Sequence, residues 1–575
     1  MIDALFVTPT ATTEVLKEAL GPVLLSTILR QQGMNVELLS FARIGDPKNY
    51  EVFFEKGISM ILEKKPRIVS FYGRSDCFHI MLLMAQRVKA ELGCYIVFAG
   101  PQADITAVAT LEEIPWVDFV CQGEGETTVY PFFSSLLKRE PDLSVAGLVY
   151  RTEDGIKVNP RPELIKDLDT LPIPDYNLYS EPVKVDPKTC FSIDVGRGCP
   201  FGCTYCSTKT FWGRKYRLKS PERIIQEVKH FHDLYGINYF AFEHDMFTMK
   251  KEQVTEICRM IKELDYKIYW NCSARLDCID KELIDTMADA GLRWIYLGIE
   301  TGSPRMQKLI NKNLKLDQTL PLVRYITSKG VRVVTSFIYG FPEETEEDIS
   351  QTLALMTDLY AMKDVQLQAH LCAFLPGTAL GEEYRDRLVR SKVYSDQTGD
   401  IGLVENEQFI FEHPRLFLQC NEYPTELRSK LAYFSLFLIV FNILRPAYLY
   451  YAKQYDRDNM IQMYFDFVED YKDILCNDEP LVTHDMVREI IAYPERFSKR
   501  FEKLPFGVRA ADVCRMQKAR FAVVYGKTST ATEILTINPD EVQKYECLED
   551  VPECWSMATV ARDANGRVQM FIRRM

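Results

Sequence analysis

The sequence has no apolar run long enough to span a bilayer. The strongest candidate, residues 431–444 (LAYFSLFLIVFNIL), ends at Arg445 and Pro446. It falls short of the roughly 20 residues that a membrane-spanning helix needs. We therefore expect no transmembrane segment and interpret the run as a buried core helix. A helix lying at a lipid interface is the alternative.

Positive charge is also scarce, because 69 Lys and Arg stand against 81 Asp and Glu among 575 residues, a formal net charge of −12. A nucleic-acid partner would need a basic face, so this balance argues against one. The start of the chain, residues 1–9, indicates a buried strand without a cationic leader. Most of the 16 cysteines are scattered, which suits a reducing compartment. We expect a cytoplasmic protein.

Three cysteines form the one dense cysteine motif, C-x3-C-x2-C at Cys199, Cys203 and Cys206. Zinc sites usually use four ligands in two pairs, and no second C-x2-C follows. An odd trio in a long chain also disfavours disulfides. Three thiolates on one loop can instead hold three irons of a 4Fe–4S cube and leave the fourth iron without a protein ligand. A plain structural metal site is the alternative.

Five residues in and around the motif define it further: Arg197, Gly198, Pro200, Gly202 and Tyr205. With them, the motif resembles the cluster loop of the radical S-adenosylmethionine (SAM) superfamily. The resemblance implies that the three cysteines bind a 4Fe–4S cluster, that the open iron takes SAM, and that Tyr205 lies near SAM. In that family an electron from the reduced cluster cleaves SAM to methionine and a 5′-deoxyadenosyl radical. An external donor such as flavodoxin or ferredoxin is therefore also implied.

Residues 1–130 alternate short apolar runs with helical patterns. Strands are predicted at residues 4–7, 36–39, 68–71, 95–99 and 118–121, with helices at 22–32 and 80–92. This alternation predicts an α/β domain with a Rossmann-like, doubly wound parallel sheet. Ligands of such sheets bind at the carboxyl ends of the strands.

Two turns at those strand ends, Gly100-Pro-Gln102 and Gly123-Glu-Gly-Glu126, resemble the cobalamin-binding domain of one large radical SAM class. A Rossmann-like sheet without cobalamin is the alternative. The Asp-x-His-x-x-Gly pattern of other cobalamin proteins is missing, and Asp76-Cys-Phe-His79 has a different spacing. We therefore expect no histidine below the cobalt. The resemblance implies cobalamin contacts from Thr8, Pro9, Gly73, Arg74, Ser75, Gly100, Gln102, Gln122, Gly123 and Glu124.

Residues 131–187 are expected to be a linker that contains a hairpin over 146–158, with Asp154-Gly155 at the turn. Residues 188–395 then repeat strand and helix about six times, which predicts a partial (β/α)6 barrel similar to a TIM barrel. The predicted strands are 191–195, 238–242, 268–273, 294–297, 333–338 and 365–370.

The ends of these barrel strands resemble the SAM-binding motifs of the family. Glu243 and Asp245 stand where the family contacts the SAM amino group. Ser273 and Arg275 match the carboxylate side, where a guanidinium can pair in bidentate fashion. Glu300 matches the ribose contact and Pro376 the adenine loop. For each charged residue alone, an ordinary salt-bridged loop is the alternative.

Residues 396–575 are expected to form a C-terminal substrate or accessory domain. It should be mainly helical over 400–510, with a small β-containing unit built from strands at 520–525 and 568–573. The full pattern resembles cobalamin-dependent radical SAM enzymes. It implies methyl transfer from methylcobalamin to an unactivated carbon of a small molecule, lipid or peptide. Rearrangement or cyclisation, a methylthiotransferase, and a non-catalytic cobalamin or redox sensor are the alternatives.

Overall fold

The structure is a computed structural model. It describes residues 2–8, 19–41, 49–180, 190–391, 395, 402–475, 486, 490, 495–524, 530–542, 550, 553–562 and 567–574. Pro9, one of the expected cobalamin contacts, lies outside the described residues. The chain divides into two compact units. The first contains Met1–Leu297, Ile310–Lys312 and Ala373–Tyr423, and the second contains Gly298–Leu309, Asn313–Cys372 and Pro424–Met575.

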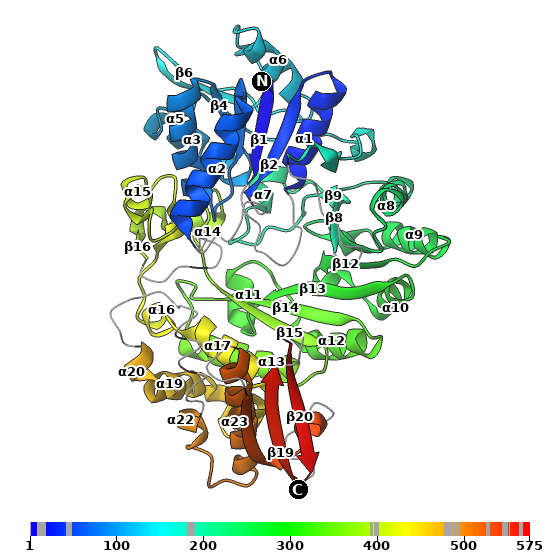
Figure 1. The fold of residues 1–575 in the computed structure, drawn as a ribbon, viewed down its shortest axis with the longest axis vertical. Helices are drawn as coiled ribbons and strands as arrows, with labels where there is room; N and C mark the ends of the chain where they lie inside the picture. The colour runs from blue at the N-terminus through cyan, green and yellow to red at the C-terminus, as the bar shows by residue number, and fades with distance from the viewer. Residues whose placement is uncertain are drawn as a thin grey trace. The chain divides into compact units, whose positions relative to one another are not determined.

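The N-terminal sheet begins with five parallel strands in the order β2-β1-β3-β4-β5 (Figure 1). The strands are β1 (Ala4–Thr8), β2 (Val36–Ser40), β3 (Ile68–Tyr72), β4 (Tyr95–Ala99) and β5 (Phe119–Cys121). Their nearly continuous apolar runs are typical of parallel strands buried on both faces by helices such as α1 (Leu20–Gln31) and α3 (Phe78–Leu92). The predicted doubly wound sheet is confirmed. Its flavodoxin-like order places the switch point between β1 and β3.

The predicted hairpin extends this same sheet. Strands β6 (Leu148–Thr152) and β7 (Gly155–Val158) pair antiparallel with each other, and β6 pairs with β5. Arg151 fastens the hairpin, because its Nε donates to the Leu111 carbonyl at 2.9 Å and its Nη2 to the Ile114 carbonyl at 2.6 Å. The sheet therefore continues past residue 130, into the segment that the sequence had indicated as a linker.

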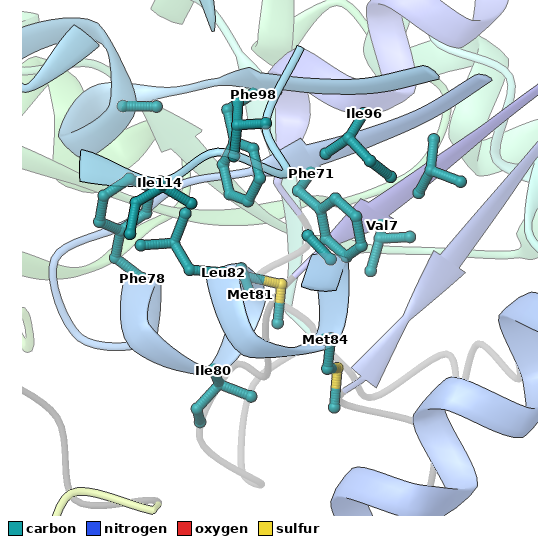
Figure 2. Close-up of a cluster of buried hydrophobic side chains, with 14 of the residues drawn as sticks. Val7, Phe71, Phe78, Ile80, Met81, Leu82, Met84, Ile96, Phe98 and Ile114 are labelled. Carbon is teal, nitrogen blue, oxygen red and sulfur yellow. The ribbon is translucent and has the colours of Figure 1, made fainter. Parts of the chain in front are cut away.

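The core of the N-terminal sheet includes a distant segment, residues 402–423, which we call the strap. Figure 2 shows this core around Phe71, Phe78 and Phe98. The strap contains α15 (Glu407–Glu412), and it places the buried ring of Phe417 6.0 Å from that of Phe78. The structure thus groups the strap with the first unit, whereas the sequence assigned residues 396–575 to one C-terminal domain. The strap's apolar residues have no regular period that could have revealed this packing.

The six predicted barrel strands are all present, in the order β15-β14-β13-β12-β11-β8. They are β8 (Phe191–Asp194), β11 (Tyr239–Glu243), β12 (Tyr269–Ala274), β13 (Leu292–Glu300), β14 (Arg332–Tyr339) and β15 (Val365–Leu371). Their connections include the helices α8 (Pro221–Tyr235), α9 (Lys251–Lys262), α10 (Lys281–Asp289), α12 (Thr319–Ser328) and α13 (Glu346–Tyr360). The partial barrel is confirmed, and it places the cluster motif just after β8.

The apolar run at residues 431–444 forms α17 (Phe434–Ile443), which is followed by α18 (Arg445–Ala452). The rings of Phe437 and Phe441 lie 4.7 Å apart and pack against Tyr448 and Phe467. In the described part of the chain, no single helix is long and apolar enough to cross a membrane. One bent pair of helices, Glu426–Ile443 and Arg445–Ala452, is long and apolar enough when the two are taken together. The pair meets at an angle of 113°, and it qualifies by length and composition only.

A three-stranded antiparallel sheet confirms the predicted C-terminal β unit. It comprises β18 (Thr530–Ile537), β19 (Glu553–Arg562) and β20 (Val568–Arg574). The predicted strand at 520–525 is wrong, because residues 520–524 end the helix α23 (Gly507–Val524). Ala519 and Val523 are one helical turn apart and both pack against Val560. A short apolar run cannot distinguish a strand from a buried helix end.

Replacing Phe417 with Ala should detach the strap, because the ring is 1% exposed and also packs against His79 and Phe409. We expect the free energy of unfolding for the first transition in urea to fall by about 3–5 kcal/mol, as it does when other buried phenylalanines are replaced by alanine. Phe571→Ala is the matched control, since that ring is 54% exposed and should change stability by less than about 0.5 kcal/mol. Equal losses in both variants would contradict this assignment.

Candidate cluster and cofactor site

The three cysteines lie on a cluster loop, residues 197–208, between β9 (Gly196–Arg197) and α7 (Thr208–Trp212). All three are half-buried free thiols. Burial raises the pKa of Cys199 to about 11, and the neighbouring charges of Cys206 and Cys203 contribute to the rise. Burial also raises the pKa of Cys206. Thiols with a raised pKa ionise more readily when a cation takes up their charge, which is the condition that bound iron meets.

Asp245 braces both ends of the cluster loop. Its Oδ2 accepts a hydrogen bond from the Gly198 N–H at 2.9 Å, and its Oδ1 accepts one from the Thr208 hydroxyl at 3.4 Å. The Thr208 oxygen in turn lies 3.3 Å from Cys206 Sγ. Glu243, at the end of β11, accepts a hydrogen bond from the Ser192 hydroxyl at 2.8 Å. Asp245 therefore lies beside the loop and Glu243 beside β8, and their role towards SAM stays a prediction.

His244 sits between these two acids as a neutral imidazole. Its Nδ1 accepts a hydrogen bond from the Met246 N–H at 2.7 Å, so its Nε2 carries the hydrogen and donates to the Arg217 carbonyl at 3.1 Å. Burial lowers the pKa of His244 and keeps the ring uncharged. The ring thus fixes the turn that presents Asp245.

Arg275, at the end of β12, also belongs to the cluster loop's surroundings. Its Nε and Nη2 donate to Asp277 at 2.8 and 3.0 Å, and Nη2 also donates to the Lys312 carbonyl. Its Nη1 lies 3.8 Å from Cys203 Sγ, and its guanidinium stacks 3.9 Å from the Phe201 ring centre. Asp277, the Lys312 carbonyl and Cys203 thus engage four of its five N–H donors. Its bidentate pairing with the SAM carboxylate stays a prediction. Ser273 precedes Arg275 on β12 and is half-buried.

The segment Ile310–Lys312, which we call the clasp, lies along the cluster loop. The Thr204 N–H donates to the Ile310 carbonyl at 3.0 Å, and Asn311 Nδ2 donates to the Gly202 carbonyl at 2.9 Å. Lys312 Nζ donates to the hydroxyl of Tyr205 at 3.3 Å. The sequence reasoning missed the clasp. Its one local signal is Asn311, whose φ of 53° is a left-handed conformation that asparagine tolerates.

A buried ion cluster joins the cluster loop to the N-terminal sheet. Arg197 binds Glu124 at 2.7 Å, Glu126 at 2.6 Å and Asp194 at 3.4 Å, and Arg217 binds Glu124 at 2.9 Å. Glu124 also accepts a hydrogen bond from the Ile165 N–H at 2.6 Å. Burial raises the pKa of Glu124, but the Arg217 hydrogen bond and the Arg197 charge outweigh it, so the pKa lies below its ordinary value.

The other predicted cobalamin contacts gather at the carboxyl ends of β1, β3, β4 and β5. Close packing there requires glycine: a Cβ on Gly100, whose φ is 99°, would meet the Tyr72 ring at 2.8 Å, and one on Gly73 would meet the Phe78 ring at 2.9 Å. The polar contacts are Thr8 Oγ1 to the Leu39 carbonyl (3.5 Å), Arg74 Nε to Asp76 (3.1 Å), Gln102 Nε2 to the Leu416 carbonyl (2.6 Å), Gln122 Nε2 to the Asp104 carbonyl (2.7 Å), the Gly123 N–H to Asp104 Oδ2 (2.6 Å), and Gln419 Nε2 to the Ser75 carbonyl (3.1 Å).

The last predicted SAM contacts fall in different units. Pro376 precedes Gly377, whose carbonyl accepts a hydrogen bond from the Thr210 hydroxyl of α7 at 2.7 Å. A Cβ on Gly377 would meet Ile105 of α4 (Pro101–Ile105) at 3.0 Å, so this loop packs beside both the cluster loop and the N-terminal sheet. Glu300 ends β13 in the second unit, buried and with a φ of 70°. Such a strained position is typical of functional residues.

Comparisons with known proteins agree with this geometry. Residues 193–356 match the radical SAM superfamily. An uncharacterized methyltransferase of Pyrococcus horikoshii is 31% identical over 329 residues, covering 56% of this chain and 71% of that protein. The chain belongs to the radical SAM superfamily.

Two further comparisons describe its relation to other members. The cytidylyl-2-hydroxyethylphosphonate methyltransferase of Streptomyces wedmorensis is 31% identical over 306 residues, which cover 47% of this chain and 56% of that enzyme. This chain thus spans little more than half of that relative. The apo structure of the cobalamin-dependent S-adenosylmethionine radical enzyme OxsB gives a TM-score of 0.61 at 14% identity, covering 95% of this chain and 82% of that one. At that identity the likeness shows the fold alone.

The three cysteines lie on one loop as half-buried thiols, which suits a 4Fe–4S cluster. Among the described residues, no three His, Cys, Asp or Glu side chains converge on one ion. A 4Fe–4S cube does not need such convergence, because each cysteine binds a different iron. His79 is buried in α3 and packs against Phe417, and the expected lack of a histidine below the cobalt stays a prediction.

Sequence reasoning also missed the strap's part in this region of the radical SAM protein. Gln419 is buried, lies 3.3 Å from the amide of Gln102 and donates to the Ser75 carbonyl. It therefore lies beside two of the expected cobalamin contacts, Gln102 and Ser75. No motif marks Gln419, because its role depends on a contact between residues more than 300 positions apart in the sequence.

Replacing Arg197 with Met should remove the cation paired with Glu126 and one of the two arginines paired with Glu124. Breaking one side of a buried ion pair costs about 3–5 kcal/mol, whereas Arg197→Lys keeps the charge and should lose less. The two losses can be measured by urea unfolding. Because the lowered pKa of Glu124 stabilises the fold only while the carboxylate is ionised, the Arg197→Met penalty should shrink as the pH falls through that pKa. A penalty that does not change in acid would contradict the pairing.

Proposed function

We propose that this chain is a cobalamin-dependent radical SAM enzyme that methylates an unactivated carbon. The observation that carries the proposal is the buried ion cluster. It ties the loop after β5, at the carboxyl ends of the N-terminal strands, to Arg197, two residues before Cys199. One compact unit therefore holds the expected cobalamin contacts and the cluster loop together.

The residues have distinct roles in this proposal. Cys199, Cys203 and Cys206 would hold the 4Fe–4S cluster, and the strand-end residues of β1, β3, β4 and β5 would hold cobalamin. When bound, the cluster with SAM supplies a carbon-centred radical and methylcobalamin supplies the methyl group. Asp245, His244 and the clasp fix the loop, so that little reorganisation is needed when SAM binds. Arg275, Glu300 and Pro376 are the proposed contacts to SAM itself.

The names of the relatives support methyl transfer, because both are methyltransferases. The whole activity remains a proposal, since the matched regions cover only part of each chain. We propose a small molecule, lipid or peptide as substrate and a cytoplasmic location with an external electron donor. Rearrangement or cyclisation without methyl transfer is the alternative outcome of the same chemistry.

The decisive experiment incubates reconstituted protein with methylcobalamin, methyl-labelled SAM, a reductant and candidate substrates, and identifies the products by mass spectrometry. We expect label on carbon together with 5′-deoxyadenosine. Cys203→Ala should lose the cluster absorbance and all SAM cleavage. The matched control is Cys278→Ala, because Cys278 is a half-buried thiol near Cys199 but outside the loop. Label-free products would favour rearrangement or cyclisation, and an intact cluster in Cys203→Ala would refute the ligand assignment.

A second prediction concerns the lower face of cobalamin. His79 belongs to the core of α3, so His79→Phe, which keeps an aromatic ring there, should leave the cob(II)alamin resonance spectrum unchanged. The hyperfine pattern of that spectrum reports a nitrogen ligand directly. Loss of such a pattern on substitution would show that His79 is an axial ligand after all.

A further inference from the structure

Three exposed basic side chains gather just after the cluster loop: Lys209 in α7, and Arg214 and Lys215 in the turn that follows. We call them the basic face. In contrast to Arg259 on α9, which pairs with Glu256 and Glu263, none of the three makes an ion pair with any residue that the structure describes. Within the described ranges they therefore have no acidic partner, in a chain of net charge −12.

The basic face is in direct contact with the cluster loop. A Cβ on Gly202 would come 2.8 Å from Arg214 Cζ, and one on Gly198 would come 3.0 Å from Trp212 Cβ. The Lys215 N–H donates to the Trp212 carbonyl at 2.8 Å, which closes the turn against the loop. Lys209 follows Thr208, whose hydroxyl oxygen lies 3.3 Å from Cys206 Sγ. A protein docked on this face would therefore lie beside the cysteines.

We propose that the basic face is the docking site for an acidic one-electron carrier protein. The inference rests on the proposed function, which needs one external electron for each SAM cleaved. The reduced carrier gives up that electron and is itself oxidised by one. SAM takes the electron as its S–C5′ bond breaks to give methionine and the 5′-deoxyadenosyl radical.

Charge explains why the carrier would bind here. An acidic protein is repelled by the net charge of the chain, so a local positive field is needed to guide it to a productive orientation. The basic face supplies that field beside the cluster loop. Because Lys209, Arg214 and Lys215 are exposed, their attraction should weaken as ionic strength rises.

The test is the double variant Lys209→Glu/Lys215→Glu in the full-length, cluster-loaded protein. Arg214 is left intact, because its guanidinium packs against Gly202. Cluster reduction is followed anaerobically by the loss of its visible absorbance, with two donors. Reduced flavodoxin is the acidic protein probe, and reduced methyl viologen is a small cationic one. At low ionic strength we expect reduction by flavodoxin to slow by about tenfold and to lose most of its salt dependence. Reduction by methyl viologen should not slow.

Lys157→Glu/Lys267→Glu is the matched control, since it makes the same charge change at two exposed lysines, on β7 and just before β12. We expect its flavodoxin rate to stay within about twofold of wild type, because steering depends on local charge. Equal slowing in both variants would overturn the inference. So would slowing with both donors, or a raised KM for an anionic substrate at an unchanged flavodoxin rate. If wild-type protein reduced by methyl viologen cleaves no SAM, the proposed function itself fails.

Discussion

The contact between Arg197 and the carboxylates of Glu124, Glu126 and Asp194 fixes where the cluster loop meets the N-terminal sheet. Removing these charges from water is costly, and an apolar contact of similar volume could give equal stability. A guanidinium bound by three acids, however, allows one orientation of the loop. Trp212 lies over both Arg197 and Arg217, at 5.9 and 5.4 Å, and so extends this constraint into α7. The cysteines between these anchors thereby gain a defined position relative to the strand ends.

The rest of the cluster loop is fixed by segments far apart in the sequence. Asp245 holds its two ends, Arg275 contacts Cys203 Sγ and Phe201, and the clasp satisfies backbone groups at Gly202 and Thr204. A reactive radical requires such fixation, because a shift of about 1 Å at the reacting centre can cost roughly a hundredfold in rate. These residues act by holding geometry, whereas the cofactors supply the chemistry.

How much could be predicted from the sequence depended on whether the signal was local. Ile68–Tyr72 is a short, mostly apolar run, and Val365–Leu371 alternates apolar and polar residues. Such strands and the cysteine spacing are local signals, so the sheet, the barrel and the cluster loop were predictable. The strap, the clasp and the Arg197 ion cluster were not, because each depends on tertiary contacts without a periodic pattern.

The cations near the cluster loop are of two kinds, buried and exposed, and their electric fields extend over different distances. Arg197 and Arg217 are largely buried and face three carboxylates, so their charge is compensated within the protein. Their field therefore contributes little beyond the surface and serves to hold the loop. Lys209 and Lys215 are exposed and have no acidic partner among the described residues, so their field extends into solvent over about a Debye length, roughly 8–10 Å at physiological salt. Similar side chains can thus fix the loop from inside and attract a charged partner from outside, and the depth of burial decides which.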